Sequence, residues 1–400
     1  MIRGEEKQMM SLLKKLVTNL IIYIFCCLPI KHNKIIFFSY YGSQYGGTPK
    51  YISQYIQKNY PSDRFDVVWV FYDLSSKQYL KGVRKVRTMS LKYFYELCTA
   101  KVVITNYRTT ELFKKRKNQY YIQTWHSSLR LKQIEKDAEK TLPAHYIRMA
   151  KKDSLKCDLL LAGCKYSTEI FNRAFWYNGE IFEHGTPGND LLFESGEDNK
   201  REIYERLNIP KHKKVFLHAP TFRKGNNLDV YDVNYESLAR TLASKFGGEW
   251  IILVKLHPHL ASKSSEIISD RNVMDVSSFD DIQELLLIAN VLLTDYSSLM
   301  FDFSITNKPC FLFVPDIKEY TSQDRGLYFE LKDLPFNTSI NQTNLEEEIR
   351  EFDHDKYKRD IENFLNRVGS FENGKASEQL VKRIEEVCFK KTRSEVDEAV

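Results

Sequence analysis

The chain has 400 residues and a formal net charge of +6, and 42% of its residues are hydrophobic and 13% aromatic. This length suits two domains of ordinary size, and the composition excludes a disordered or low-complexity protein. The seven cysteines are mostly far apart, which argues against a disulfide framework and against a zinc site. Without a zinc-finger spacing or an RNA-binding aromatic motif, we expect no nucleic-acid partner.

The N-terminus contains an apolar segment that suggests a membrane. Residues 16–30 are uncharged and mostly apolar, and lysines flank them on both sides. This run of fifteen residues is shorter than the roughly 20 that span a bilayer. We therefore interpret residues 1–33 as a membrane-associated surface helix whose basic flanks meet anionic lipid. A helix buried against the first domain is the alternative.

From residue 34 onward, short β-rich runs alternate with helical stretches. Residues 49–60 have helical periodicity, with a proline near the first turn. The expected strands of the first half are residues 35–39, 65–71, 102–105 and 120–125. Strands that alternate with helices predict βαβ units and a parallel sheet. We assign residues 34–195 to this first domain.

A second series of the same kind follows the polar segment 194–200. Its expected strands are residues 214–218, 250–256, 273–276, 291–294 and 309–313, and its expected helices are residues 235–245, 282–289 and 298–305. We assign residues 196–390 to a second α/β domain and residues 391–400 to a charged tail. Both halves are expected to be doubly wound, with ligands bound at the carboxyl ends of the strands.

His126 lies where the last expected strand of the first half ends, and Ser127 and Ser128 follow it. A histidine at this edge can act as a general base near neutral pH, and the hydroxyls and backbone amides beside it can hold an anion. The alternative is a surface histidine without a catalytic role. We predict that His126 is catalytic.

His257 occupies a similar place at the end of strand 250–256 in the second half. Pro258 follows it, so its backbone should be extended. Because side chains alternate along a strand, Lys255 shares the face of His257 and would add positive charge toward a phosphoryl group.

Two further segments of the second half suit a phosphate. After strand 214–218, Thr221 offers a hydroxyl and Arg223 a planar fork, although a structural salt bridge is an equal alternative for the arginine. Strand 291–294 ends at Thr294, and Ser297 then precedes an expected helix, whose first turn has unpaired N–H groups. An ordinary helix cap is the alternative.

Several other chemistries lack their motifs. The glycine-containing loop 42–47 has neither the Walker spacing nor G-x-G-x-x-G, and the chain has no G-x-S-x-G and no HExxH. Nucleotide hydrolysis, a dinucleotide cofactor, serine-hydrolase chemistry and a metal site are therefore not expected.

The ordered motifs QTWHSS, HAPTFR, VKLHP and LLTDYSSLMFDF resemble those of the CDP-glycerol glycerophosphotransferase family, the teichoic acid primases and polymerases. The likeness covers roughly residues 123–331. It implies a GT-B fold, in which two Rossmann-like domains face a central cleft. It also implies transfer of glycerol phosphate or ribitol phosphate from a CDP-activated donor to a hydroxyl of a lipid-linked acceptor. Such enzymes are peripheral, monotopic proteins on the cytoplasmic face of the membrane.

The resemblance also implies roles for individual residues. His126 would deprotonate the acceptor hydroxyl, and His257 would contact the donor phosphates. The expected donor-binding residues are Ser127, Ser128, Pro220, Thr221, Arg223, Lys255, Leu256, Thr294, Ser297, Ser298 and Asp302. No cofactor beyond the CDP-linked donor and no metal ligand is expected.

Two positions depart from the family pattern. Ser127-Ser128-Leu129 stands where Gly-Thr-Pro is usual, and Gly188 stands where an arginine is expected. If that arginine normally binds phosphate, another basic residue such as Arg223 would have to replace it.

Two other functions remain open at this point. A GT-B glycosyltransferase that uses a nucleotide sugar for surface polysaccharide would share the fold, and a catalytically silent scaffold would share the membrane helix. The expected partners of an active enzyme are the CDP-polyol donor, the lipid-linked acceptor and an anionic membrane surface.

Overall fold

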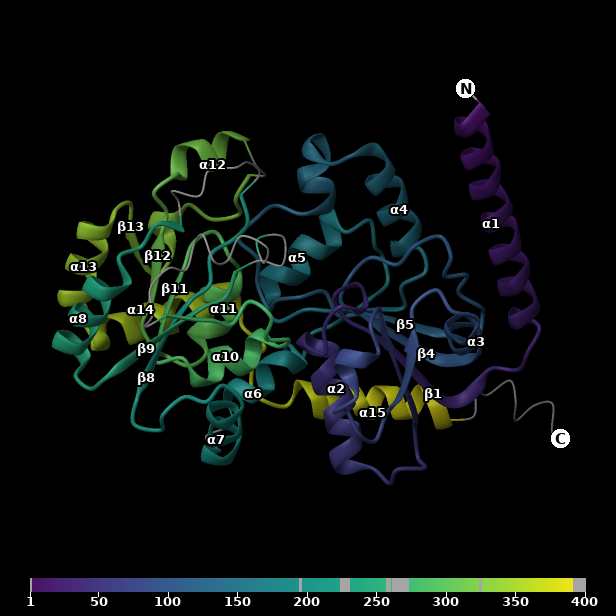
Figure 1. The fold of residues 1–400 in the computed structure, drawn as a ribbon, viewed down its shortest axis with the longest axis horizontal. Coiled ribbons are helices and arrows are strands. Elements are labelled where there is room, and N and C mark those ends of the chain that lie inside the picture. Colours follow the sequence, from purple (N-terminus) through teal and green to yellow (C-terminus); the bar gives the residue numbers. More distant parts are fainter. Residues whose placement is uncertain are drawn as a thin grey trace.

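The computed structural model describes residues 2–193, 196–223, 231–256, 260, 273–323 and 326–390, and it describes side chains throughout these ranges except at residues 2–12 and 321–323. Figure 1 shows two α/β halves side by side, with the N-terminal helix at one edge. The expectation of an α/β protein with two parallel sheets is confirmed.

The first sheet has the doubly wound strand order β3-β2-β1-β4-β5-β6-β7, and every neighbouring pair is parallel. Its strands are β1 (Lys31–Phe38), β2 (Asp66–Phe71), β3 (Arg84–Arg87), β4 (Ala100–Thr105), β5 (Tyr120–Gln123), β6 (Leu159–Leu161) and β7 (Glu180–Phe182). Three of these, β3, β6 and β7, were not expected from the sequence because they are short.

Helices cover both faces of this sheet, which is why its strands are almost continuously apolar. Ile35 and Phe37 of β1 pack in one core, toward α2 (Gly47–Asn59), whereas Ile36 and Phe38 pack in the other, toward α3 (Leu91–Thr99). The remaining helices between the strands are α4 (Ala144–Ser154) and α5 (Lys165–Ala174).

The second sheet repeats this order as β10-β9-β8-β11-β12-β13, again entirely parallel. Its strands are β8 (Lys214–His218), β9 (Trp250–Val254), β10 (Val273–Asp275), β11 (Val291–Thr294), β12 (Cys310–Phe313) and β13 (Asn337–Ser339). Its helices are α8 (Tyr235–Phe246), α10 (Ile282–Ile288), α11 (Leu299–Ser304), α12 (Ile317–Gln323), α13 (Gln342–Arg350) and α14 (His354–Val368). Two helices, α6 (Asp190–Phe193) and α7 (Glu197–Arg206), connect the halves.

The last helix, α15 (Ala376–Phe389), crosses back to the first half. Its apolar side chains Leu380, Val381 and Ile384 are fully buried in the same core as Ile35 of β1, and Figure 1 shows this yellow helix beside β1 and α2. The segment 196–390 is therefore not one packing unit, because its C-terminal end completes the first domain.

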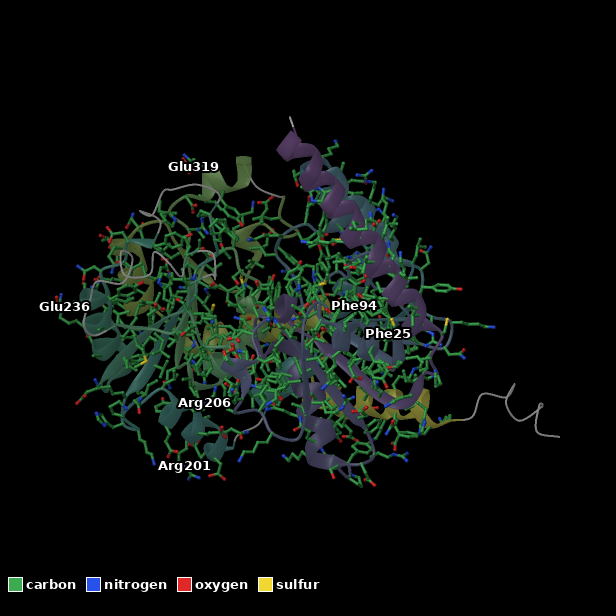
Figure 2. All side chains as sticks on the ribbon, turned by 45° about the vertical axis from the view of Figure 1, so that its right-hand side comes forward. Phe25, Phe94, Arg201, Arg206, Glu236 and Glu319 are labelled. Carbon is green, nitrogen blue, oxygen red and sulfur yellow. The ribbon has the colours of Figure 1, made fainter. Side chains whose placement is uncertain are left out.

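The N-terminal helix α1 (Ile2–Cys26) lies partly against the first domain and partly outside it, and its expected association with a membrane stays a prediction. Its inner end packs on the first domain, where Ile22 is buried and Phe25 lies in the same cluster as Phe94 of α3 (Figure 2). Farther out, Leu16 and Leu20 are 67% and 60% exposed. Within the described part of the chain, we find no helix long and apolar enough to cross a membrane.

Candidate active site

The carboxyl end of the first sheet is organised by Asn106, which directly follows β4. Its side chain accepts a hydrogen bond from the backbone N–H of Tyr40 (3.0 Å) and donates one to the Ser39 hydroxyl (3.3 Å). Because β1 and β4 flank the point where the strand order reverses, these contacts join the two loops at which doubly wound sheets bind their ligands.

His126 lies at this edge with an exposed ring. Its Nδ1 is 3.1 Å from the Asn106 carbonyl oxygen. A carbonyl only accepts, so this contact places the proton on Nδ1, and Nε2 is then the basic nitrogen of the neutral ring. The ring also stacks on Trp125, with centroids 4.5 Å apart and planes 21° from parallel. The side chain therefore has the tautomer and the restricted orientation that a general base requires.

Ser128 and Asp302 are joined directly to each other. The backbone N–H and the hydroxyl of Ser128 both donate to Asp302 Oδ1, at 3.1 and 2.6 Å, and the Asn189 amide donates to the same oxygen at 3.1 Å. Burial raises the pKa of Asp302, against the effect of these hydrogen bonds. Ser128 and Asp302 were both expected to bind the CDP-linked donor. In the structure they connect the loop after β5 to α11 of the second domain. Ser127 is partly exposed beside them.

The hydroxyl residues after β11 have separate structural contacts. Thr294 is fully buried and donates to the Ala219 carbonyl (2.7 Å). Ser297 accepts from the Leu299 N–H (3.3 Å) just before α11, and Ser298 accepts from the Leu131 N–H of the first domain (3.4 Å). Helix α11 begins at Leu299, one residue later than expected.

Arg223 is held by carboxylates of its own domain. Its guanidinium lies 2.8 Å from Asp295 and 2.6 Å from Asp316, and it also donates to the carbonyl and hydroxyl oxygens of Thr221. The Thr221 N–H donates to Asp295 in turn (3.0 Å), just after buried Pro220. Of the two alternatives for Arg223, the structure has the salt bridge, and the expected contact of this residue with a phosphate stays a prediction.

The end of β9 is also anchored by internal contacts. The Lys255 ammonium donates to the Ser277 carbonyl (2.9 Å) and to that of Phe279. Burial lowers the pKa of Lys255 to about 8. Leu256 is buried, and its N–H donates to the Ser277 hydroxyl (3.0 Å). His257, the second expected catalytic residue, lies outside the described residues, so its role stays a prediction.

Gly188 is buried at the contact between the domains. A side chain at this position would start 3.4 Å from the Thr48 hydroxyl and 3.6 Å from Gln283. An arginine here would therefore enter the domain interface, where it would face the start of α2.

An acidic pair at the start of α10, Asp280 and Asp281, binds the first domain and was not predicted from the sequence. Asp281 accepts from the Lys50 ammonium (2.7 Å), the Tyr51 hydroxyl (2.6 Å) and the Gly47 N–H (3.3 Å). The first turn of α2, a position that holds phosphate in many doubly wound folds, thus holds a carboxylate from the second domain. No local pattern signals this contact, because the partners are more than 200 residues apart.

Among the side chains described, no group of three or more His, Cys, Asp or Glu residues is arranged to hold a metal ion.

The sequence and fold match those of known proteins. The family described as CDP-Glycerol:Poly(glycerophosphate) glycerophosphotransferase matches residues 20–386. A teichoic acid poly(glycerol phosphate) polymerase of Staphylococcus epidermidis is 35% identical over 88% of this chain and 50% of its own length. A teichoic acid glycerol-phosphate transferase of Staphylococcus aureus is 32% identical over 93% of this chain and 98% of its own length.

A solved structure of the wall teichoic acid polymerase TagF superimposes with a TM-score of 0.81 at 32% identity, covering 96% of this chain and 98% of that one. The chain spans about half the length of the polymerases of S. epidermidis and Bacillus subtilis that it matches. The match over nearly the whole chain shows that it belongs to the CDP-glycerol:poly(glycerophosphate) glycerophosphotransferase family.

Proposed function

We propose that this protein transfers glycerol phosphate from CDP-glycerol to a hydroxyl of a membrane-linked acceptor in teichoic acid synthesis, with release of CMP. The observation that carries the proposal is His126, whose Nδ1 contacts a backbone carbonyl at the carboxyl edge of the first sheet. The relatives named as glycerol phosphate polymerases and transferases support the choice of donor.

The proposed reaction is an in-line displacement at the phosphorus that bears the glycerol. The acceptor oxygen forms a new bond to this phosphorus while the bond to CMP breaks, and the hydroxyl proton passes to Nε2 of His126. A general base of this kind contributes about 10²–10⁴-fold to the rate. The rest of the catalysis consists of positioning and charge stabilisation, as in other phosphoryl transfers.

We further propose a GT-B-like division of labour, with the acceptor on the first domain and the donor on the second. The Asp281 carboxylate at the first turn of α2 supports this assignment, because a second anion there would be repelled. On the second domain, the loops that carry Thr221 and Ser297 follow β8 and β11, the strands that flank its switch point. His257 would contact the donor phosphates there.

We also propose that α1 holds the enzyme on the cytoplasmic face of the membrane as a peripheral protein. The exposed apolar side chains of its outer part lie at helical spacing, beside Lys14 and Lys15: Leu13, Leu16, Val17, Leu20 and Ile24. Such a surface suits the boundary between lipid headgroups and acyl chains. The double variant Leu16→Glu, Leu20→Glu should lose binding to anionic vesicles, and retained vesicle binding would contradict this assignment.

The experiment that tests the reaction mixes the purified protein with a lipid-linked acceptor and CDP-glycerol, CDP-ribitol or a UDP-sugar. CMP release with CDP-glycerol supports the proposal, whereas release of UDP with transfer of a sugar supports the glycosyltransferase instead. His126→Ala should lose at least about 10²-fold in rate while it still binds CDP-glycerol. Near-normal transfer by that variant would refute the catalytic assignment.

A further inference from the structure

Arg108 is a buried arginine next to the residue on which His126 stacks. It is 2% exposed, and its guanidinium carbon lies 3.7 Å from the ring centre of Phe175 and 5.8 Å from that of Trp125. Trp125 and Phe175 meet edge to face at 4.9 Å. The planar cation and the two rings therefore pack as one unit, and the ring of His126 lies on the tryptophan of that unit.

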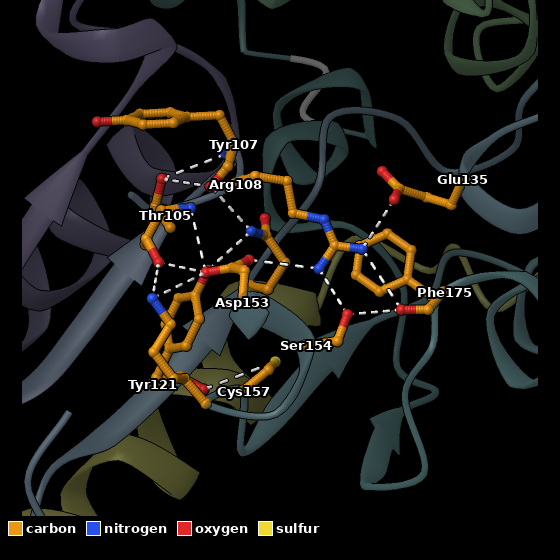
Figure 3. A network of polar contacts seen from close by, with 12 residues as sticks. Thr105, Tyr107, Arg108, Tyr121, Glu135, Asp153, Ser154, Cys157 and Phe175 are labelled. Atoms are coloured by element: carbon orange, nitrogen blue, oxygen red, sulfur yellow. Dashed lines mark hydrogen bonds and ion pairs between the residues drawn. The ribbon is translucent and has the colours of Figure 1, made fainter. Parts of the chain in front are cut away.

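Two carboxylates fix the direction of the guanidinium (Figure 3). Arg108 Nη2 is 3.2 Å from Glu135, and Nη1 is 3.3 Å from Asp153 and donates to the Ser154 hydroxyl at 2.8 Å. Glu135 is held in turn by the Tyr146 hydroxyl (2.7 Å). A guanidinium held from two sides by charged partners has little freedom to rotate away from the aromatic rings.

The same loop holds the backbone of Trp125. The Trp125 N–H donates to the Gln123 side chain (3.0 Å), whose amide donates to the Tyr107 carbonyl (2.9 Å), directly before Arg108. Trp125 has a φ of 52°, in the left-handed region that a bulky residue adopts only when its surroundings demand it. Consecutive residues after β4 thus hold Nδ1 of His126, the backbone of Trp125 and the ring of Trp125.

We propose that Arg108 is a positioning residue for His126. Its guanidinium holds the Trp125 ring against Phe175, and the Trp125 ring keeps the imidazole in the plane where Nδ1 meets the Asn106 carbonyl. The position of the His126 imidazole, and hence its tautomer, depends on the planar shape of the Arg108 side chain and not only on the charge of that side chain. The effect on catalysis rests on the proposed function of His126.

The variant that separates shape from charge is Arg108→Lys. It keeps a cation between Glu135 and Asp153, so no buried carboxylate loses its only compensation, but it removes the flat group that lies over the Phe175 ring and beside Trp125. The matched control is Arg84→Lys. Arg84 also pairs with two carboxylates, Asp66 and Glu96, at the far edge of the same sheet on β3.

The test records the ring ¹⁵N resonances of His126 in protein labelled at histidine, assigned by their loss in His126→Asn, together with kcat and KM for CDP-glycerol. We expect the Nδ1–H tautomer in the native protein and a mixture of tautomers in Arg108→Lys. We also expect kcat to fall by about 10-fold to 100-fold, as for other small misplacements of a catalytic group, with KM nearly unchanged. Arg84→Lys should leave the resonances and kcat as in the native protein.

Native-like His126 resonances and kcat in Arg108→Lys would overturn the proposal, as would an equal change in both variants. A shifted tautomer without any loss of kcat supports the positioning role and refutes the catalytic role of His126. The two proposals can therefore fail separately.

Discussion

Asp281 joins the two domains, and replacing it with asparagine measures how much it contributes. The substitution keeps the size of the side chain and removes its charge. In the native protein Asp281 receives the Lys50 ammonium at 2.7 Å, the Tyr51 hydroxyl at 2.6 Å and the Gly47 N–H at 3.3 Å, and its side chain is 2% exposed. Burial alone would lower the pKa of Lys50. The Asp281 and Glu284 carboxylates outweigh this effect and raise that pKa above its ordinary value.

The loss of interface free energy in Asp281→Asn depends on which charges remain beside Lys50. Breaking a buried ion pair by removing one partner costs about 3–5 kcal/mol. Glu284 remains 2.6 Å from Lys50 and still compensates the cation, so we expect a smaller loss of interface free energy, about 2–3 kcal/mol. Because about 1.4 kcal/mol corresponds to a factor of ten, opening of the interface should become roughly 30-fold to 150-fold more frequent.

Hydrogen exchange followed by mass spectrometry detects this opening locally. Peptides that cover the first turn of α2 and the start of α10 should exchange faster by that factor, since both lose protection when the domains separate. The control is Glu236→Gln, an exposed residue of α8 that pairs with Arg240 far from the interface (Figure 2). Such a surface pair contributes at most about 1 kcal/mol. Unchanged exchange at both segments of Asp281→Asn would refute the idea that this carboxylate holds the domains together.

Two further predictions concern the charged side chains of Arg223 and Glu372. Arg223→Lys cannot bridge Asp295 and Asp316 as the planar fork does, so the second domain should lose about 1.5–3 kcal/mol of stability, measured by urea unfolding. Isothermal titration should show nearly native affinity for CDP-glycerol in this variant, and a large loss of affinity at native stability would instead indicate a direct phosphate contact. Burial raises the pKa of Glu372 to about 8, and the Asp302 carboxylate adds to the rise. Because the folded pKa is above the unfolded value of 4.5, the folded state binds the extra proton, so stability should fall as pH rises from about 4.5 to about 8. Melting temperatures across this range should fall less steeply in Glu372→Gln, and identical slopes would contradict the assignment.

Sequence patterns predicted the sheets well because strands buried on both faces are continuous apolar runs. Strand β8 and strand β11 have the predicted bounds, and β4 differs by two residues at one end. The place of His126 followed from the same pattern, since a polar residue after such a run must lie at the carboxyl edge of the sheet. Residues 376–389 were assigned to the second domain, whereas as α15 they pack in the core of the first, because the sequence does not indicate which of two sheets an amphipathic helix covers.

The partners of the charged residues were much harder to predict. Arg223 and Lys255 were predicted to contact a donor phosphate, which stays untested, and the structure pairs them with groups of the protein itself, the Asp316 carboxylate and the Ser277 carbonyl. The chemistry of a side chain determines the kind of partner, whereas the fold determines which atom of that kind is nearest. The contact between His126 and the Asn106 carbonyl was the hardest to predict. Every residue has a backbone carbonyl, so the sequence does not indicate which one will meet the histidine.

The acidic pair at the start of α10 also supports the proposal that two halves with the same strand order have different tasks. In each half, the loops beside the switch point are where an anionic ligand would bind. In the first half, the Asp281 carboxylate already occupies the first turn of α2, and a diphosphate there would meet a buried negative charge. In the proposed division of labour, the donor is thereby directed to the second half, and the first half offers His126 to an acceptor alcohol. Asp281→Asn should lower the selectivity of the first half against anions as well as loosen the interface, so CDP-glycerol at high concentration should compete with the acceptor in that variant. Substrate inhibition that is no stronger than in the native enzyme would show that Asp281 is only a structural contact.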